Sequence, residues 1–285
     1  MSENNQGKCS SGKSCSECGG GCDAAKKKLH TNLEGIKHII LVMSGKGGVG
    51  KSTVSTNLAL ALSMRGFKVG LLDTDFHGPS VPKMLGLEGA ELLGDGEMIM
   101  PVDGGDNLKV MSIGFSLSSP HQAVIWRGPV KYGVLQQLLG EVRWGELDYL
   151  VIDVPPGTGD EALSLCQMLP QADGAVVVTT PQQVAATDVS KSLDFLRQLD
   201  FNVIGIVENM SGFVCPHCGE ITAIFSSGAG EELAAQYGVK VLGRIPIDPA
   251  VCSSGDSGNP VVRAHADSAT AKAFNAVVDN ITATK

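Results

Sequence analysis

A phosphate-loop pattern runs from residue 45 to residue 52: Gly45-Lys46-Gly47-Gly48-Val49-Gly50-Lys51-Ser52. It has the spacing of glycine, four residues, glycine, lysine and serine or threonine. An apolar run at residues 38–43 precedes it, and a leucine- and alanine-rich stretch at residues 52–65 follows it. This order predicts a strand, a glycine-rich turn and a helix, in which backbone N–H groups surround phosphate oxygens. We therefore predict a nucleotide-binding loop.

Three side chains of this loop have separate predicted roles. Lys51 supplies positive charge at the β- and γ-phosphates, and Ser52 binds Mg²⁺. Lys46 is not demanded by the pattern, so its side chain either leans toward a phosphate from outside the loop or stays in solvent. The sequence leaves both interpretations of Lys46 open.

Acidic residues follow two further apolar runs. Asp73-Thr74-Asp75 comes after one run, and Asp153 comes after the other. Because the carboxyl ends of parallel strands line the crevice in which ligands bind, Asp153 is expected to support Mg²⁺ and Asp75 to orient the attacking water. A helix cap or a turn is the alternative for each. The proline- and glycine-rich residues 154–159 predict a switch loop that responds to the γ-phosphate.

Short apolar runs alternate with helical stretches along the rest of the chain. Besides 38–43, the predicted buried strands are residues 68–73, 108–113, 149–154, 175–180, 203–207 and 241–245. A helix is predicted over residues 160–169, and a closing helix over residues 264–282. Continuous apolar strands that alternate with helices predict an α/β fold with a doubly wound, mostly parallel sheet.

Composition restricts the classes of function. The 285 residues carry 22 lysines and arginines against 30 acidic residues, a net charge of −8, which argues against a nucleic-acid binder that depends on a basic surface. The first 30 residues hold no apolar run that could serve as a signal-peptide core, and no stretch has the length of a membrane span, so we predict a cytoplasmic protein without a membrane partner. Eight cysteines in that compartment stay reduced, which favours metal binding or catalysis.

Four of the eight cysteines lie in the first 22 residues: Cys9, Cys15, Cys18 and Cys22. The surrounding segment is rich in glycine, serine and lysine and has little to bury, so it needs a bound metal to become ordered. We predict a flexible or metal-binding segment at residues 1–34 and a phosphate-loop NTPase domain at residues 35–285. Four thiolates suit zinc or an iron–sulfur cluster, and spacing does not separate the two.

A second cysteine motif, Cys215-Pro216-His217-Cys218, has the spacing at which two thiolates hold one metal or cluster iron. One chain then offers two of four ligands, which predicts a symmetric homodimer that shares one site. A redox dithiol is one alternative. A zinc knuckle completed by His217, Cys252 or the N-terminal cysteines is another. Cys166 lies in a predicted helix and is expected to be a small buried side chain.

These motifs together resemble the Mrp/ApbC-type, Nbp-like iron–sulfur cluster carrier proteins of the MinD/ParA group of P-loop NTPases. The resemblance extends from about residue 36 to the C-terminus. It rests on Lys46-Gly47-Gly48-Val49-Gly50-Lys51-Ser52-Thr53, Asp73-Thr74-Asp75-Phe76-His77-Gly78-Pro79-Ser80, Asp153-Val154-Pro155-Pro156-Gly157-Thr158-Gly159-Asp160, Thr180-Pro181-Gln182, Val207-Glu208-Asn209-Met210 and the motif at Cys215 and Cys218.

The resemblance implies a slow ATPase with a deviant Walker A loop, in which residues 45–53 bind ATP and Mg²⁺. It also implies that Lys46 contacts the ATP of a dimer partner, that Asp75 helps to activate water and that Asn209 contacts adenine. Cys215 and Cys218 would bridge a labile 4Fe–4S cluster between two subunits. The cluster would come from iron–sulfur assembly machinery and pass to apo-proteins. The N-terminal cysteines resemble a second cluster site of Nbp-type relatives, with zinc as the alternative.

Two other classes of ATPase share the phosphate loop. A positioning or partitioning ATPase would need a C-terminal membrane helix or a basic DNA-binding surface, and residues 275–285 have neither character. A zinc-stabilised regulatory ATPase is the stronger alternative. Our preferred interpretation is a homodimeric ATPase that carries an iron–sulfur cluster.

Overall fold

The protein is described by a computed structural model, which defines residue 29 and residues 31–117, 125–215, 217–218, 220–225 and 227–283. Its central feature is an eight-stranded sheet with the order β10-β7-β6-β1-β5-β2-β4-β3. Neighbouring strands are parallel, except that β3 pairs antiparallel with β4. The strands are β1 (Ile36–Ser44), β2 (Val69–Asp73), β3 (Val102–Gly105), β4 (Leu108–Ser112), β5 (Leu147–Asp153), β6 (Gly174–Thr179), β7 (Val203–Glu208) and β10 (Val241–Arg244).

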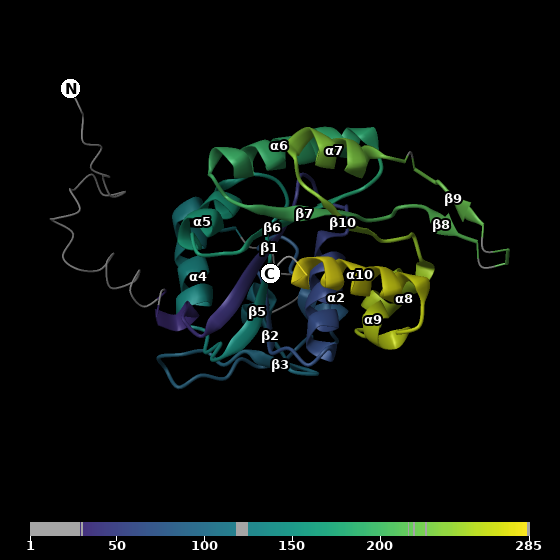
Figure 1. The fold of residues 1–285 in the computed structure, drawn as a ribbon. Helices are drawn as coiled ribbons and strands as arrows, with labels where there is room; N and C mark the ends of the chain where they lie inside the picture. The colour runs from purple at the N-terminus through teal and green to yellow at the C-terminus, as the bar shows by residue number, and fades with distance from the viewer. Residues whose placement is uncertain are drawn as a thin grey trace, which may run out of the picture.

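Helices cover both faces of this sheet (Figure 1). One face carries α4 (Gly128–Gly140), α5 (Asp160–Met168), α6 (Gln183–Gln198) and α7 (Ala229–Tyr237). The other carries α2 (Lys51–Met64), α9 (Val261–Ala264) and α10 (Ala269–Thr282), with the short α3 (Val81–Met84) and α8 (Pro249–Asp256) beside them. A 3-10 turn, η1 (Ile113–Ser116), follows β4. The predicted doubly wound fold is confirmed.

The central strand β1 shows why continuous apolar runs become parallel strands here. Leu41 and Met43 join the core beneath α4 to α7, whereas Ile40 and Val42 join the core beneath α2 and α10. Successive side chains of a strand point to opposite faces, so a strand covered on both sides is apolar at every position. All seven predicted strands are present in the sheet.

Three features differ from the sequence prediction. The antiparallel edge strand β3 was not predicted, because its four residues, Val102–Gly105, include two glycines and an aspartate and form no apolar run. The hairpin of β8 (Phe213–Val214) and β9 (Ile221–Thr222) was not predicted either. The single closing helix predicted over residues 264–282 is wrong at its start. There α9 ends at Ala264, and Ser268 caps α10 by accepting a hydrogen bond from Ala271 N at 3.0 Å.

Packing of the described chain begins a few residues ahead of β1. Leu29 and Leu33 are buried against the α4 side of the core, and the Asn32 side chain donates to the carbonyl oxygens of Leu139 and Val142. The division predicted at residues 34 and 35 stays a prediction. The predicted ligands Cys9, Cys15, Cys18 and Cys22 lie outside the described residues. Within the described ranges, no helix combines the length and the apolar character needed to cross a bilayer.

Candidate nucleotide site and cysteine hairpin

The phosphate loop joins the carboxyl end of β1 to the first turn of α2, as predicted. Gly48 and Gly50 adopt φ angles of 81° and 83°, which side chains larger than glycine rarely tolerate. Gly45 is required for a different reason. A Cβ atom there would lie 2.4 Å from the backbone carbonyl carbon of Asp188 in α6. The loop is thus held against α6 at the start of α2, where the amides of a helix N-terminus favour an anion.

Lys51, Ser52 and Asp153 form one buried polar group at the base of the loop. Lys51 Nζ lies 2.8 Å from Asp153 Oδ1, and Ser52 Oγ donates to Asp153 Oδ2 at 2.6 Å. Asp75 Oδ2 is 3.9 Å from the same ammonium. The structure therefore brings together the predicted phosphate-binding lysine, the hydroxyl and both predicted carboxylates.

Asp73 is a buried carboxyl beside Asp153, in register with it across the β2–β5 pair. Its oxygens accept hydrogen bonds from Asp75 N at 3.1 Å, Ser112 Oγ at 3.0 Å and Val81 N at 3.4 Å. Burial, and then the charge of Asp153, raise the pKa of Asp73 to about 7. Asp73 fixes the backbone that carries Asp75, so it is a positioning residue that our sequence prediction did not include among the site residues.

Lys46 lies in the outer part of the loop, half-exposed. Its carbonyl oxygen accepts a hydrogen bond from Ser44 Oγ at 3.0 Å, which ties the loop backbone to the end of β1. Within the described part of the chain, its ammonium has no hydrogen bond or ion pair. The backbone position is fixed while the charge remains available to a ligand or to a second chain.

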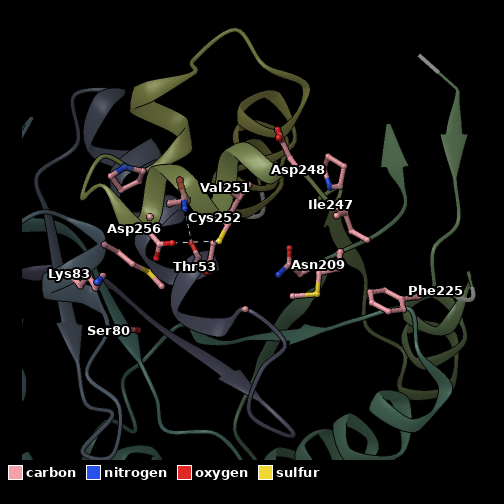
Figure 2. A pocket seen from close by; sticks show the side chains of 17 residues that line it. Thr53, Ser80, Lys83, Asn209, Phe225, Ile247, Asp248, Val251, Cys252 and Asp256 are labelled. Carbon is pink, nitrogen blue, oxygen red and sulfur yellow. Dashed lines mark hydrogen bonds between the residues drawn. The ribbon is translucent and has the colours of Figure 1, made fainter. Parts of the chain in front are cut away.

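A pocket of about 500 Å³ opens next to the phosphate loop (Figure 2). This volume falls within the roughly 300–1,000 Å³ typical of small-molecule sites. Figure 2 shows Asn209, Ile247 and Phe225 on one side and Thr53, Cys252 and Asp256 on the other. Because Gly50 and Thr53 line the pocket as well, a ligand with phosphates in the loop would extend its other end into this space.

Asn209 links the pocket to the phosphate loop. Its side-chain amide donates to the Val49 carbonyl oxygen at 2.9 Å, and its backbone N–H donates to the Thr179 carbonyl oxygen at the end of β6. A Cβ atom on Gly50 would lie 2.2 Å from Asn209 Nδ2. The predicted adenine-contacting residue thus lies directly behind the loop, at the junction of β7 and the pocket.

The two acidic loops of the site are tied to helix α4. Lys131 Nζ donates to Glu161 Oε1 at 2.5 Å in the first turn of α5, and to His77 Nε2 at 3.0 Å in the loop after Asp75. The neighbouring Phe76 ring lies 5.9 Å from the same ammonium. Our sequence prediction missed this connection, because no local signal relates residue 131 to residues 77 and 161.

Cys215 and Cys218 lie at the tip of the β8–β9 hairpin, which projects from the body of the protein (Figure 1). Cys218 is exposed and Cys215 is partly exposed. The backbone N–H groups of Cys218 and His217 donate to the Cys215 sulfur and hold the pKa of that thiol below its usual value. The structure therefore brings the two predicted sulfur ligands together on an accessible turn.

The other cysteines of the described chain lie elsewhere. Cys166 is buried in the core beside α5, and burial raises its pKa to about 11, which confirms the predicted buried role. Cys252 lines the pocket and its thiol is 3.8 Å from Asp256 Oδ2. No group of three or more potential metal ligands gathers anywhere in the described ranges. Neither His217 nor Cys252 therefore completes a metal site with Cys215 and Cys218 inside the described chain.

The comparisons with known proteins support the same class of site. Residues 35–282 match the family model described as ParA, NUBPL iron-transfer P-loop NTPase. The chain therefore belongs to this family of P-loop NTPases. The predictions of fold, of ATPase class and of an iron–sulfur cluster carrier family are confirmed at this level, and the alternative of a zinc-stabilised regulatory or positioning ATPase is disfavoured.

Relatives of known name cover most of the chain. An iron–sulfur cluster carrier protein of Saccharolobus solfataricus is 48% identical over 258 residues, 90% of this chain and 87% of that protein. The cytosolic Fe-S cluster assembly factor NUBP2 of Homo sapiens is 49% identical over 254 residues, 88% of this chain and 94% of that protein. A solved nucleotide-binding protein of Archaeoglobus fulgidus, in complex with ADP and with Co, is 43% identical. It has a TM-score of 0.73 and covers 82% of this chain and 91% of its own.

Proposed function

We propose that this protein is an ATP-hydrolysing carrier that binds a labile 4Fe–4S cluster at Cys215 and Cys218 and transfers it to apo-proteins. One observation carries the proposal. The described chain presents two thiols on a projecting hairpin, with no third ligand gathered beside them, next to a complete phosphate-loop site. An exposed, half-filled ligand set suits a cargo that is handed on, because structural metal sites are closed by their own four ligands.

Two copies of the chain would supply a full ligand set. Cluster irons bind four thiolates, and two chains related by a twofold axis provide two each. Lys46 supports this arrangement, because its ammonium has no partner in the described part of the chain while its backbone is fixed by Ser44. We assign Lys46 to the ATP of the partner subunit.

The residues at the base of the loop suit Mg²⁺. Ser52 Oγ and Asp153 Oδ2 are 2.6 Å apart, and the buried Asp153 Oδ1 accepts no well-aligned hydrogen bond despite its ion pair with Lys51. Oxygen donors of this kind are those that Mg²⁺ prefers. Ser52 would hold the ion and Asp153 would support it; the bound ion neutralises charge on the β- and γ-phosphates.

The remaining site residues have the roles that their positions support. The Gly45–Ser52 backbone and Lys51 bind phosphate oxygens, with Thr53 following in α2. Asp75, held by the Asp73 carboxyl at the edge of the crevice, orients the attacking water. Asn209 contacts the base in the adjoining pocket. Lys51 exchanges its ion pair with Asp153 for phosphate contacts when ATP binds.

The proposed cluster cargo implies which proteins the chain interacts with. The relatives are named as iron–sulfur cluster carriers or assembly factors, and six of the matched assembly factors are called cytosolic. We therefore propose a cytoplasmic homodimer that receives clusters from assembly machinery and delivers them to apo iron–sulfur proteins, without a nucleic-acid or membrane partner. Cys9, Cys15, Cys18 and Cys22 are proposed to hold a second cluster or zinc.

Anaerobic reconstitution tests the proposal. Iron, acid-labile sulfide and zinc are quantified in the wild type, in Cys215→Ala/Cys218→Ala, in a variant with alanine at all four N-terminal cysteines, and in a variant with all six of these cysteines replaced. We expect iron and sulfide in equal amounts, lost from the hairpin variant when the N-terminal four are also replaced. Cys252→Ala is the matched control and should keep the cluster. Stoichiometric zinc without sulfide in the wild type would contradict a cluster carrier.

A further inference from the structure

The cysteine hairpin is attached to the wall of the nucleotide pocket at both of its ends. On the entering side, Met210 lines the pocket, and the Gly212 carbonyl oxygen accepts a 2.7 Å hydrogen bond from Ile247 N. On the leaving side, Phe225 projects into the same pocket (Figure 2). Ile247 is itself a pocket residue, and it also bridges to Phe213 in β8. The chain segments that enter and leave the hairpin therefore each carry a side chain that lines this pocket, Met210 before β8 and Phe225 after β9.

One buried carboxylate fixes both ends of the segment between β7 and α7 that carries the hairpin. Glu208, at the end of β7, accepts a hydrogen bond from Ser211 Oγ at 2.6 Å and another from Gly230 N at 2.9 Å. These two partners come just before the hairpin and just after the return of the chain to α7. Arg244 forms ion pairs with Glu208 and Glu231 on the same side. The segment between β7 and α7 is thus held at both of its ends by the Glu208 side chain.

The hairpin beyond that base has little to hold it in place. It consists of two-residue strands joined by the pairs Phe213–Thr222 and Val214–Ile221, with Cys215 N donating to the Glu220 carbonyl oxygen. Ile221 and Ile224 remain 71% and 54% exposed, so neither side chain belongs to the packed core of the described chain. A two-stranded hairpin on its own is marginally stable in water. Its mobility is therefore set by the contacts at the pocket.

We infer that Phe225 is a positioning residue that contacts the bound nucleoside and thereby couples nucleotide occupancy to the mobility of the Cys215–Cys218 hairpin. The inference deepens the proposed function, since the hairpin is its cluster site. With nucleotide bound, Phe225 is anchored and the hairpin is held at both ends. Without nucleotide, the entering side keeps its backbone contacts with Ile245 and Ile247 and the Glu208 base, whereas Phe225 on the leaving side loses its anchor. Nucleotide release would then loosen the cluster ligands independently of the switch loop predicted at residues 154–159.

Hydrogen–deuterium exchange on the full-length, cluster-free protein tests this coupling. Exchange is followed in hairpin peptides covering residues 213–224 and in phosphate-loop peptides covering residues 45–53, with and without saturating Mg²⁺-ADP. In the wild type, we expect ADP to slow exchange in both regions, by roughly fivefold or more in the hairpin, the lower end of typical coupling between two sites. The phosphate-loop peptides report occupancy independently of the hairpin.

Variants at neighbouring positions separate coupling from a loss of structure. Phe225→Ala should keep the ADP protection of the phosphate loop but lose that of the hairpin. Phe225→Tyr, which keeps the ring, should restore it. Ile224→Ala is the matched control, because this exposed neighbour does not line the pocket, and it should behave as the wild type.

Each contrary result has a distinct meaning. Hairpin protection by ADP that survives in Phe225→Ala would overturn the role of Phe225. An unprotected hairpin in the wild type with a protected phosphate loop would overturn the coupling. No protection in either region would overturn the nucleotide site and the coupling together. Because the assay uses free thiols, failure of cluster binding in the reconstitution experiment would leave its outcome intact.

Discussion

Two aspartates at the ends of adjacent strands have different partners for their buried carboxyl groups. Asp73 and Asp153 lie in register at the ends of β2 and β5, and both are wholly buried. Lys51 compensates the charge of Asp153 directly at 2.8 Å. Asp73 is held by a hydroxyl and backbone amides, and burial raises its pKa to about 7. The Lys51 ammonium therefore forms its ion pair with Asp153, and Asp73 is left with hydrogen-bond donors as its nearest partners.

The raised pKa of Asp73 makes a pH-dependent contribution to stability. Below about pH 4, Asp73 is protonated in both the folded and the unfolded chain. Between that pH and about 7 the folded protein keeps a proton that the unfolded chain has lost, so stability falls as the pH rises. Asp73→Asn removes the titration and keeps an oxygen that accepts from Asp75 N. The wild type loses this stability as the pH rises from 5 to 8, and the variant does not. We therefore expect the free energy of unfolding of the variant, relative to that of the wild type, to increase by about 1–3 kcal/mol from pH 5 to pH 8.

Urea unfolding without Mg²⁺ or nucleotide, at both pH values, checks this expectation. Glu88→Gln, at an exposed carboxyl, controls for the loss of a surface charge. A stability difference between Asp73→Asn and wild type that is the same at pH 5 and pH 8 would show that burial does not raise the pKa of this carboxyl.

At the scale of elements, helix α6, which is distant in the sequence, packs against the phosphate loop and restricts one of its glycines. Gly45 and Gly47 look equivalent in the pattern, but their surroundings differ. A Cβ atom at Gly45 would overlap the Asp188 backbone of α6, whereas nothing lies within 4 Å of a Cβ atom at Gly47. The close approach of β1 and α6 therefore requires glycine at residue 45 for packing, and not only for phosphate access.

Substitution of these two glycines should separate the effects. Gly45→Ala is expected to destabilise the nucleotide-free protein by about 1–3 kcal/mol, because α6 must move to admit the methyl group. Gly47→Ala is expected to change the stability by no more than about 0.5 kcal/mol. Urea unfolding of both variants without nucleotide makes the comparison. Equal destabilisation of the two would mean that the contact with α6 does not constrain the loop.

At the scale of the whole molecule, the ligand count of one chain predicts its assembly. Because Cys215 and Cys218 have no third ligand in the described structure, a 4Fe–4S cluster on the hairpin should be held by two chains. In a variant that lacks the four N-terminal cysteines, we expect one cluster per two chains and elution of the cluster-bearing fraction as a dimer. Size-exclusion chromatography with light scattering, combined with iron analysis, measures both. A cluster-bearing monomer would contradict the shared site.

The local chemistry of this protein was readable from its sequence. The phosphate loop, the buried strands and the acidic strand ends were predicted because each is a contiguous pattern whose physical cause is local. Glycines permit the turn, and strands covered on both faces are apolar throughout. The spacing of Cys215 and Cys218 likewise predicted a pair of thiols able to bind one metal ion or cluster iron.

Only the tertiary structure decided how these parts act on one another. Three relations join residues far apart in the chain: the raised pKa of Asp73, the contacts of Lys131 with His77 and Glu161, and the place of Phe225 in the pocket beside the phosphate loop. Such relations depend on burial and on contacts between elements, for which a short stretch of sequence carries no periodic or compositional signal. The sequence determined which chemical groups the chain contains. The packing of helices and strands around one edge of the sheet determined which of these groups lie in contact and which influence one another's charge.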